Sequence, residues 1–464
     1  MTINADFFKI IKEDCGNAFS EDAPAKPDVV FIDGQVKLMK AAQVDSWGLF
    51  FAIQFFKTIE NCFALGASTV VLGFDDYRHV PASKNMTQVK RSKQKIVLAF
   101  SDTSTLPSKM PEDWGGAMAN RSFKIKVITK VLEVTEAWFK KKLASDFSYR
   151  ERNLVLDYAG VPKLIHLGVD DVVHPIQHFI NEHEWVPQNN TVGRGECDIK
   201  AFVWMNVSKL LCIVSTDGDY LPLALLQTHE NIKSCRSKSC NVILYRMTTQ
   251  TRVEKSTIPA KRKLAGTCEN KTKTPRKYEY VDIACIAVWL KKVMPSKATD
   301  PVLHFCALVA LCGCDFTRNL PRLGPRTLWK LRHMLSHIDL LQISQIMSAL
   351  SIVYSDLYVM KNTMPVGIRN SAEWFKNTSE EAIFAIFDQV VTRIQRSSNI
   401  SSSIKQQLWQ ADTAMAHARN AVWTMHYWMH LDNCPDPNPE FGYVRDSKGR
   451  THFACEKPSA VSGS

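Results

Sequence analysis

Aspartate closes three apolar segments that lie far apart in the sequence. The segments are VVFID at 29–33, VVLGFD at 70–75 and LLCIVSTD at 210–217, and a further acidic element, GECD, carries Glu196 and Asp198. Carboxylates held together repel one another unless cations neutralise them, and ligands made only of oxygen suit Mg²⁺ or Mn²⁺. Two such ions can hold a phosphodiester between them. Metal-assisted phosphodiester hydrolysis is therefore the first hypothesis.

Each aspartate also has a plainer interpretation. Asp and Gly populate tight turns for their own backbone reasons, so STDGDY at 215–220 is also what a turn at the end of a strand requires. For any single aspartate at a strand end, a turn or helix cap is the more frequent role. The same placement of acids at several strand ends favours metal ligands, because capping does not require it.

The apolar segments predict the elements that must position these acids. They are rich in Val, Ile and Leu without alternation, which indicates strands buried on both faces of a parallel sheet. The stretch 35–66 predicts a crossover helix between the first two strands. In such sheets the functional crevice lies beyond the carboxyl ends of the strands. Residues two apart on a helix face different ways, so this pair can act as ligands only if Glu196 sits at or just before a helix start and Asp198 lies in the first turn.

Further elements are predicted along the rest of the chain. A helix is expected from Phe123 to about Ala144, and strands are expected at NVILYR, from 241, and at YEYVDIACIAVWL, from 278. Between these two strands, residues 250–278 hold nine Lys or Arg against two acids, which indicates an exposed basic loop. From 339 to the end the pattern is mostly helical.

Composition narrows the class of protein. The chain has 464 residues, of which 45% are hydrophobic and 22% are charged, as in soluble globular proteins. The net charge of +12 favours a polyanionic partner, most commonly nucleic acid. Thirteen cysteines, many inside apolar runs, favour reduced thiols in an intracellular protein. No apolar run reaches the ~18 residues of a membrane span, and no secretory signal is recognisable.

Five stretches resemble, in order, the motifs of the flap endonuclease and XPG family of structure-specific 5′ nucleases. They are IDGQVKLMK from 32, GFDDYRHVPASKNMTQVKR from 73, GECDIKAF from 195, STDGDY from 215 and LCGCDFTRNLPRLGPRTLWKL from 311. The resemblance covers roughly residues 1–345. It implies two Mg²⁺ ions, replaceable by Mn²⁺, and seven acids that hold them: Asp33, Asp75, Glu196, Asp198, Asp217, Asp219 and Asp315.

The resemblance also implies residues that bind the substrate. Lys84 and Arg91 would lie at the base of a helical arch and contact the scissile phosphate as catalytic residues, while Lys90 lines the arch or touches backbone phosphates. The last motif resembles a helix-two-turn-helix, a candidate K⁺ site, where a glycine turn lets the backbone approach a phosphate. Its DNA-binding residues would be Arg318, Arg322, Gly324, Arg326 and Lys330. As an alternative, its arginines form only a solvated basic face.

Three positions depart from the family pattern. Asp76 replaces the glycine that usually follows the second aspartate, and it adds a further acid beside the site. Met39 stands where many members carry an aromatic side chain that stacks on a base. Thr2 replaces the usual second-position glycine.

These observations predict an α/β protein with the PIN-like 5′-nuclease fold, a mostly parallel central sheet flanked by helices. The nuclease core would span 1–345, with the arch at about 84–146, the basic loop at about 250–278 and the helix-two-turn-helix at about 312–335. Residues 346–464 would form a mostly helical extension. The resemblance predicts a Mg²⁺-dependent nuclease that cuts flap or branched DNA.

Two other functions stay open, a ribonuclease on the same fold that degrades mRNA, and a non-catalytic DNA-binding scaffold. PAKRK, from 259, resembles a nuclear import signal, so the nucleus or a site of viral DNA replication is the expected location. As an alternative, the same residues are a solvated charge run or a DNA contact. We expect a monomer that binds DNA without a membrane partner, and no clear sliding-clamp peptide is recognisable.

Overall fold

The computed structural model describes the greater part of the chain up to residue 340 and short segments beyond it. The described residues are 4–23, 25–39, 44, 46–75, 106–158, 162–166, 197–206, 208–233, 240–248, 277–294, 300–314, 317, 324–333, 335–336, 338–340, 346, 349–350, 411–429, 443–445 and 451–453.

The core of the fold is an eight-stranded mixed sheet with the strand order β1-β8-β7-β6-β2-β3-β4-β5. The five strands from β7 to β4 in this order are parallel, whereas β1, β5 and β8 pair antiparallel at the two edges. This confirms the predicted α/β class with a mostly parallel sheet. The strand bounds are β1 (Phe19–Ser20), β2 (Val29–Asp33), β3 (Thr69–Gly73), β4 (Asn153–Asp157), β5 (Lys163–Ile165), β6 (Leu210–Val214), β7 (Asn241–Thr248) and β8 (Lys277–Asp282).

Strands β2 and β3 lie at the centre because their side chains are apolar on both faces. Every residue of both strands is buried. Val30 and Ile32 pack into one hydrophobic cluster, and Phe31, which points the other way, packs into a second cluster. The sheet is therefore covered by helices on both sides, as the uninterrupted apolar runs predicted.

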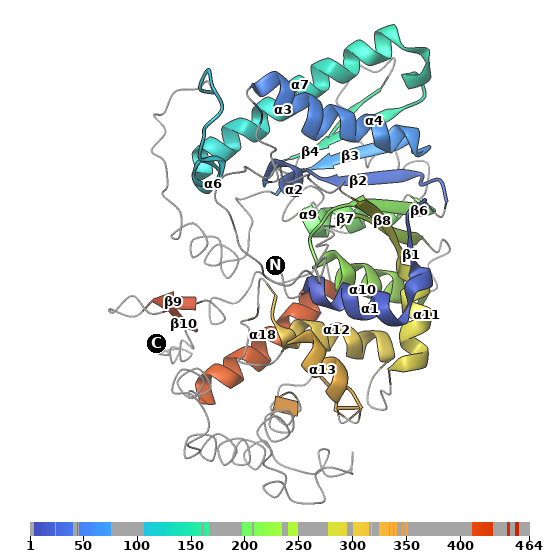
Figure 1. Cartoon of the computed structure of the whole chain (residues 1–464), viewed down its shortest axis with the longest axis vertical. Helices are drawn as coiled ribbons and strands as arrows, with labels where there is room; N and C mark the ends of the chain where they lie inside the picture. The colour runs from blue at the N-terminus through green and yellow to red at the C-terminus, as the bar shows by residue number, and fades with distance from the viewer. Residues whose placement is uncertain are drawn as a thin grey trace, which may run out of the picture.

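One face of the sheet is covered by helices from the first third of the chain (Figure 1). The predicted crossover helix is broken into pieces, because Ser46 caps a new helix by accepting a hydrogen bond from the Leu49 N–H. The pieces are α2 (Gly34–Met39), α3 (Trp47–Phe51), a π-helical turn (Ala52–Phe56) and α4 (Lys57–Ala64). The helices α6 (Trp114–Ala119) and α7 (Arg121–Ser145) complete this layer, and α7 confirms the helix expected from Phe123.

The N-terminal helix and helices from the later two thirds of the chain cover the other face (Figure 1). They are α1 (Asn4–Asp14), α9 (Cys197–Val203), α10 (Tyr220–Lys233), α11 (Ile283–Val293), α12 (Pro301–Cys312), α13 (Pro325–Leu331) and α18 (Ala411–Met429). Helix α18 joins this layer through its buried Ala418 and Met425, and the Trp428 carbonyl accepts a hydrogen bond from the Gln227 side chain (2.7 Å). A two-stranded sheet is formed by β9 (Tyr443–Arg445) and β10 (Thr451–Phe453).

One sequence prediction is corrected here. The segment YEYVDIACIAVWL, predicted as a strand, is a strand only up to Asp282, and α11 follows directly. The side chain of Asp282 accepts a hydrogen bond from the Cys285 N–H (3.0 Å) and so caps the helix. The helix has an apolar face, buried at Ile283, Ile286 and Leu290, whose spacing was hidden in a continuous apolar run. NVILYR, in contrast, is confirmed as part of β7.

Among the described helices, none has the length and apolar character that crossing a membrane requires.

Candidate metal centre

The carboxyl ends of β2, β3 and β6 lie at one edge of the sheet. Asp33 at the end of β2 is level with Gly73 of β3, and Ile32 is level with Val214 of β6. Asp75 follows β3 and Asp217 follows β6 in the sequence. Both therefore lie at the same edge of the sheet as Asp33. The structure brings these acids together as the strand pattern predicted.

Asp33 is the most enclosed acid of this edge, with 4% of its surface exposed. Its carboxylate accepts hydrogen bonds from the Val36 N–H (3.0 Å) and the Ser215 hydroxyl (2.9 Å). Burial, together with the negative charges of Asp75 and Asp217, raises the pKa of the Asp33 carboxyl from 3.8 to about 7, despite these hydrogen bonds. Burial of the Asp33 carboxylate, together with the charges of Asp75 and Asp217, therefore disfavours its ionised form.

The segment STDGDY forms a turn that also aligns its acids. The Ser215 hydroxyl, which donates to Asp33, accepts a hydrogen bond from the Asp217 N–H (3.1 Å). The Asp217 carboxylate in turn accepts from the Asp219 N–H (3.2 Å), and α10 begins at Tyr220. Turn formation and the gathering of acids are therefore not alternatives, because the same side chains do both.

Helix α9 adds Asp198 to this edge. The helix begins at Cys197, so Asp198 lies in its first turn, as predicted. The Cys197 N–H donates to the Asp75 carboxylate (2.9 Å), which ties the start of α9 to the end of β3. The buried phenol of Tyr220 has a pKa raised by burial and by the charges of Asp33, Asp198 and Asp217. All three acids thus lie within electrostatic reach of one side chain.

Several predicted site residues lie outside the described part of the chain. They are Lys84, Lys90, Arg91, Glu196, Asp315, Arg318 and Arg322. Within the described part, no three His, Cys, Asp or Glu side chains converge as the ligands of one ion. The described acids share one edge of the sheet. Their assignment as metal ligands stays a prediction.

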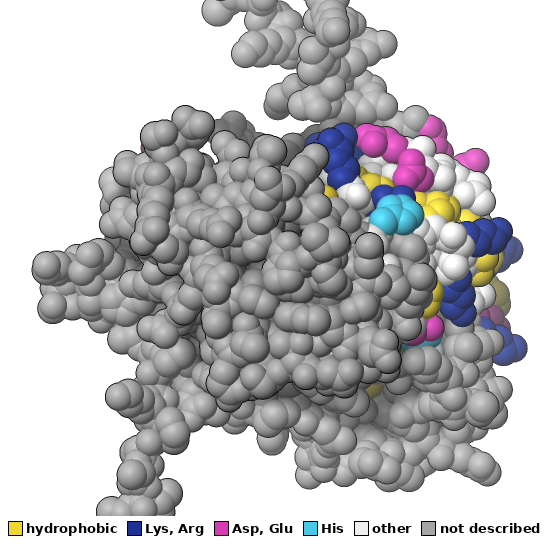
Figure 2. All heavy atoms as spheres, turned by 90° about the horizontal axis from the view of Figure 1, so that it is seen from below, with side chains coloured by type: hydrophobic (Ala, Val, Ile, Leu, Met, Phe, Trp, Pro, Cys, Tyr) yellow, Lys and Arg dark blue, Asp and Glu magenta, His cyan; other side chains and the backbone are white. Residues whose placement is uncertain are grey.

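The predicted helix-two-turn-helix is described only from Gly324 onward. Gly324 precedes α13 with extended backbone (φ −98°), a conformation open to any residue, and a Cβ atom placed there would meet no atom of the described residues within 4 Å. The glycine is thus not required by the turn itself, although it leaves an open backbone surface. Arg326 forms an ion pair with Glu13 of α1 (3.1 Å), and Lys330 is exposed. Figure 2 shows both signs of charge on the described part of the lower face.

Sequence reasoning missed two charged residues at the same edge. Asp157 ends β4 level with Gly73, and its carboxylate pairs with Lys200 of α9 (3.0 Å). The segment NLVLD, 153–157, repeats the pattern of an apolar run that ends in Asp, so the signal was present. Lys200 gave no comparable signal, since a lysine in a predicted helix is usually solvated.

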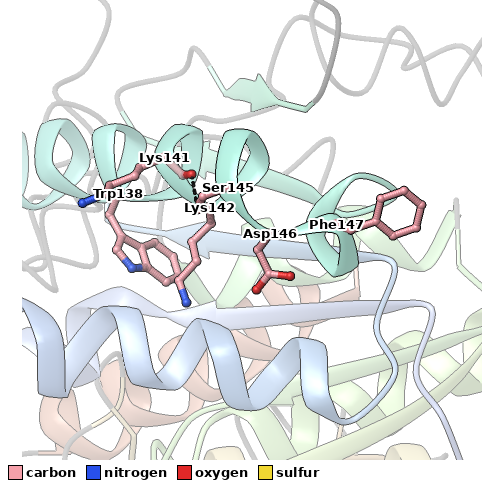
Figure 3. Close-up of a pocket in the computed structure, with 6 residues that line it drawn as sticks. All are labelled: Trp138, Lys141, Lys142, Ser145, Asp146 and Phe147. Carbon is pink, nitrogen blue, oxygen red and sulfur yellow. Dashed lines mark hydrogen bonds between the residues drawn. The ribbon is translucent and has the colours of Figure 1, made fainter.

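A separate pocket of about 490 Å³ lies at the far end of α7 (Figure 3). Because α7 leads through a short helical turn into the start of β4, this pocket is at the edge of the sheet opposite the acids. Its lysine Lys142 pairs with Glu60 (2.9 Å). The lining residues are Trp138, Lys141, Lys142, Ser145, Asp146 and Phe147.

Gly34, the residue after Asp33, is closely packed against the end of β3, and a substitution there tests this packing. A Cβ atom at Gly34 would lie 2.6 Å from the Gly73 carbonyl oxygen and 2.7 Å from the Phe74 ring. We expect Gly34→Ala to lower the free energy of unfolding by about 1–3 kcal/mol in urea denaturation, as overpacking does. Gly48→Ala in α3 is the matched control, because its Cβ would meet no atom of the described part of the chain within 4 Å. Equal stability of the two variants would contradict this packing.

Comparison with known proteins adds no assignment to the site. The sequence matches no protein-family model, and a search of curated proteins likewise finds no match. The function is therefore argued from the residues and geometry described above.

Proposed function

We propose that the protein is a Mg²⁺-dependent nuclease that hydrolyses phosphodiester bonds in flap or branched DNA. The observation that carries the proposal is the gathering of Asp33, Asp75, Asp198, Asp217 and Asp219 at one edge of the sheet, where burial and the repulsion from Asp75 and Asp217 raise the pKa of Asp33 to about 7. A protein that only binds DNA gains nothing from this repulsion, because it weakens the attraction for phosphate. A site that recruits divalent cations requires it.

The chemistry of the donor set fits Mg²⁺ or Mn²⁺. The side chains are carboxylates, which are hard oxygen ligands, and a divalent cation would favour the ionised form of Asp33, whose pKa is raised by burial and by the charges of Asp75 and Asp217. The described acids, joined by Glu196 and Asp315 from the sequence motifs, would hold the ions. Bound ions of this kind lower the pKa of a coordinated water and stabilise charge on a phosphodiester oxygen.

Backbone and side-chain donors of the chain itself hold the acids of this edge. The Val36 N–H and Ser215 hydroxyl orient the Asp33 carboxylate, and the Cys197 N–H orients Asp75. Because each contact comes from a different element, the acids are held by the fold and not by their own flexible side chains. Such preorganisation is what a site for transition-state charge needs.

The choice of DNA, and of a 5′ nuclease, rests on the motif resemblance. Its most specific part is LCGCDFTRNLPRLGPRTLWKL, and the mostly parallel sheet is compatible with the PIN-like fold that it implies. Lys84 and Arg91 would contact the scissile phosphate under this proposal. The net charge of +12 favours a nucleic acid but does not distinguish DNA from RNA.

A cleavage screen tests the proposal. Purified full-length protein is incubated with labelled 5′-flap, nicked, hairpin and single-stranded DNA and with structured and single-stranded RNA, in Mg²⁺ or in chelator. We expect Mg²⁺-dependent cutting that is at least about tenfold faster on the flap than on either RNA. Faster cutting of RNA would favour the ribonuclease. Tight DNA binding without any cutting in Mg²⁺ or Mn²⁺ would favour the scaffold.

A further inference from the structure

Lys200 is a buried lysine beside the candidate metal centre, with 2% of its surface exposed. Its ammonium donates to the Asp157 carboxylate (3.0 Å) and to the Phe74 carbonyl oxygen (2.8 Å). Both partners are at the carboxyl edge of the sheet, where Asp157 ends β4 and Phe74 follows β3. A buried charge is costly, so this pair needs an explanation beyond the filling of space.

The contacts of Lys200 join three elements that meet at the acids. The Phe74 N–H donates to the Asp157 carbonyl (2.9 Å), so the ends of β3 and β4 are held together, and Lys200 adds α9 to them. Phe74 is the residue before Asp75, and Lys200 follows Asp198 by two positions. A second tie, from the Cys197 N–H to the Asp75 carboxylate, connects the same two segments. The position of Asp198 relative to Asp75 is therefore set by these contacts.

We propose that Lys200, held in place by Asp157, is a positioning residue that fixes α9 against the end of β3 and so sets the spacing of Asp75 and Asp198. The role rests on the proposed function, because the two acids need a defined spacing only if they hold a metal ion. In this role Lys200 contacts Asp157 and Phe74 and acts on the ligands only through them. Its positive charge also offsets part of the repulsion at this edge without occupying the place of a ligand.

A contribution to folding stability does not by itself explain why a buried ion pair is present here. Replacing a buried ion pair by apolar residues of similar volume is often neutral or stabilising, whereas removing one partner leaves an uncompensated charge. A purely structural pair can therefore be exchanged for an apolar pair without functional loss. A pair that positions ligands cannot, because the contact with the Phe74 carbonyl disappears with the ammonium.

The double variant Lys200→Met/Asp157→Leu separates these two roles. Mn²⁺ binding is measured on the full-length protein by the electron paramagnetic resonance of free Mn²⁺, and folding is followed by circular dichroism. We expect cooperative unfolding close to that of wild-type protein, with Mn²⁺ affinity about 10-fold to 100-fold weaker, as for other residues behind metal ligands. The control, Lys142→Met/Glu60→Leu, removes an ion pair at the opposite edge of the sheet and should bind Mn²⁺ as wild-type protein does.

The outcomes distinguish the inference from the proposed function. Wild-type affinity in the folded double variant would overturn the positioning role while leaving the proposed nuclease intact. Wild-type protein that binds no Mn²⁺ would overturn the proposed function and the inference with it. If the double variant does not fold, Asp157→Asn keeps the size and one acceptor but holds the ammonium less strongly. It should weaken Mn²⁺ binding about fivefold, and unchanged binding would count against the positioning role.

Discussion

The Asp217→Asn variant should cut 5′-flap DNA about 10³-fold more slowly than wild-type protein while binding the same DNA at least as tightly. The expected loss corresponds to several kcal/mol of transition-state stabilisation, the scale of a metal ligand's contribution. The fold should survive, because asparagine has the same size as aspartate. Its side-chain oxygen can still accept the hydrogen bond that the Asp219 N–H donates to the Asp217 carboxylate (3.2 Å). DNA affinity should not fall, since one negative charge is removed from the edge.

Two measurements check this prediction. Single-turnover cleavage in Mg²⁺ gives the rate of the chemical step, and fluorescence anisotropy in chelator gives the affinity for DNA. Asp22→Asn is the matched control, because the same substitution falls on an exposed residue that is not among the acids proposed as metal ligands. If Asp217→Asn and Asp22→Asn cut at the same rate, Asp217 holds no catalytic ion.

The central strands could be predicted from the sequence because their burial leaves a local signal. β2, β3 and β6 are short, mostly apolar runs that are buried on both faces, a pattern that β4 shares. The antiparallel edge strands were a different case. β1 has two residues and β5 has three, so their pairing depends on neighbours that are distant in sequence. Helix α11 was also not predicted, because its helical spacing of buried residues is hidden in a continuous apolar run.

The acids of the candidate site were found because each one follows an apolar strand or begins a helix. Their position at one edge follows from the parallel direction of the strands, which the sequence pattern indicates. The pairing of Lys200 with Asp157 could not be predicted in this way. It depends on how α9 is placed across the ends of β3 and β4, which is a tertiary packing relation between segments 43 residues apart. A buried lysine and a solvated one have the same appearance in a sequence.

The Asp33→Asn variant should be more stable than wild-type protein at pH 8 in the presence of a chelator. The folded-state pKa of Asp33 is raised from 3.8 to about 7, so the native protein binds this proton more tightly than the unfolded chain does. The free energy of unfolding therefore falls as the pH rises from about 4 to about 7, and the full cost remains above pH 7. At about 1.4 kcal/mol per pKa unit, removing the charge should gain up to about 4 kcal/mol at pH 8 and little at pH 4.

Asparagine can keep both hydrogen bonds that hold this side chain, because its oxygen accepts from the Val36 N–H and its amide donates to the Ser215 oxygen. Asp146→Asn is an opposite control. Its exposed carboxylate accepts from the Ser148 hydroxyl and N–H, which lower its pKa, so neutralising it should reduce stability at pH 8. Adding Mg²⁺ should reverse the order for Asp33, since bound ions stabilise only a protein that retains the ligand. If the Asp33→Asn protein is less stable than wild-type protein at pH 8 in chelator, the charge of Asp33 does not destabilise the folded protein. The argument for a cation site would then lose its main support.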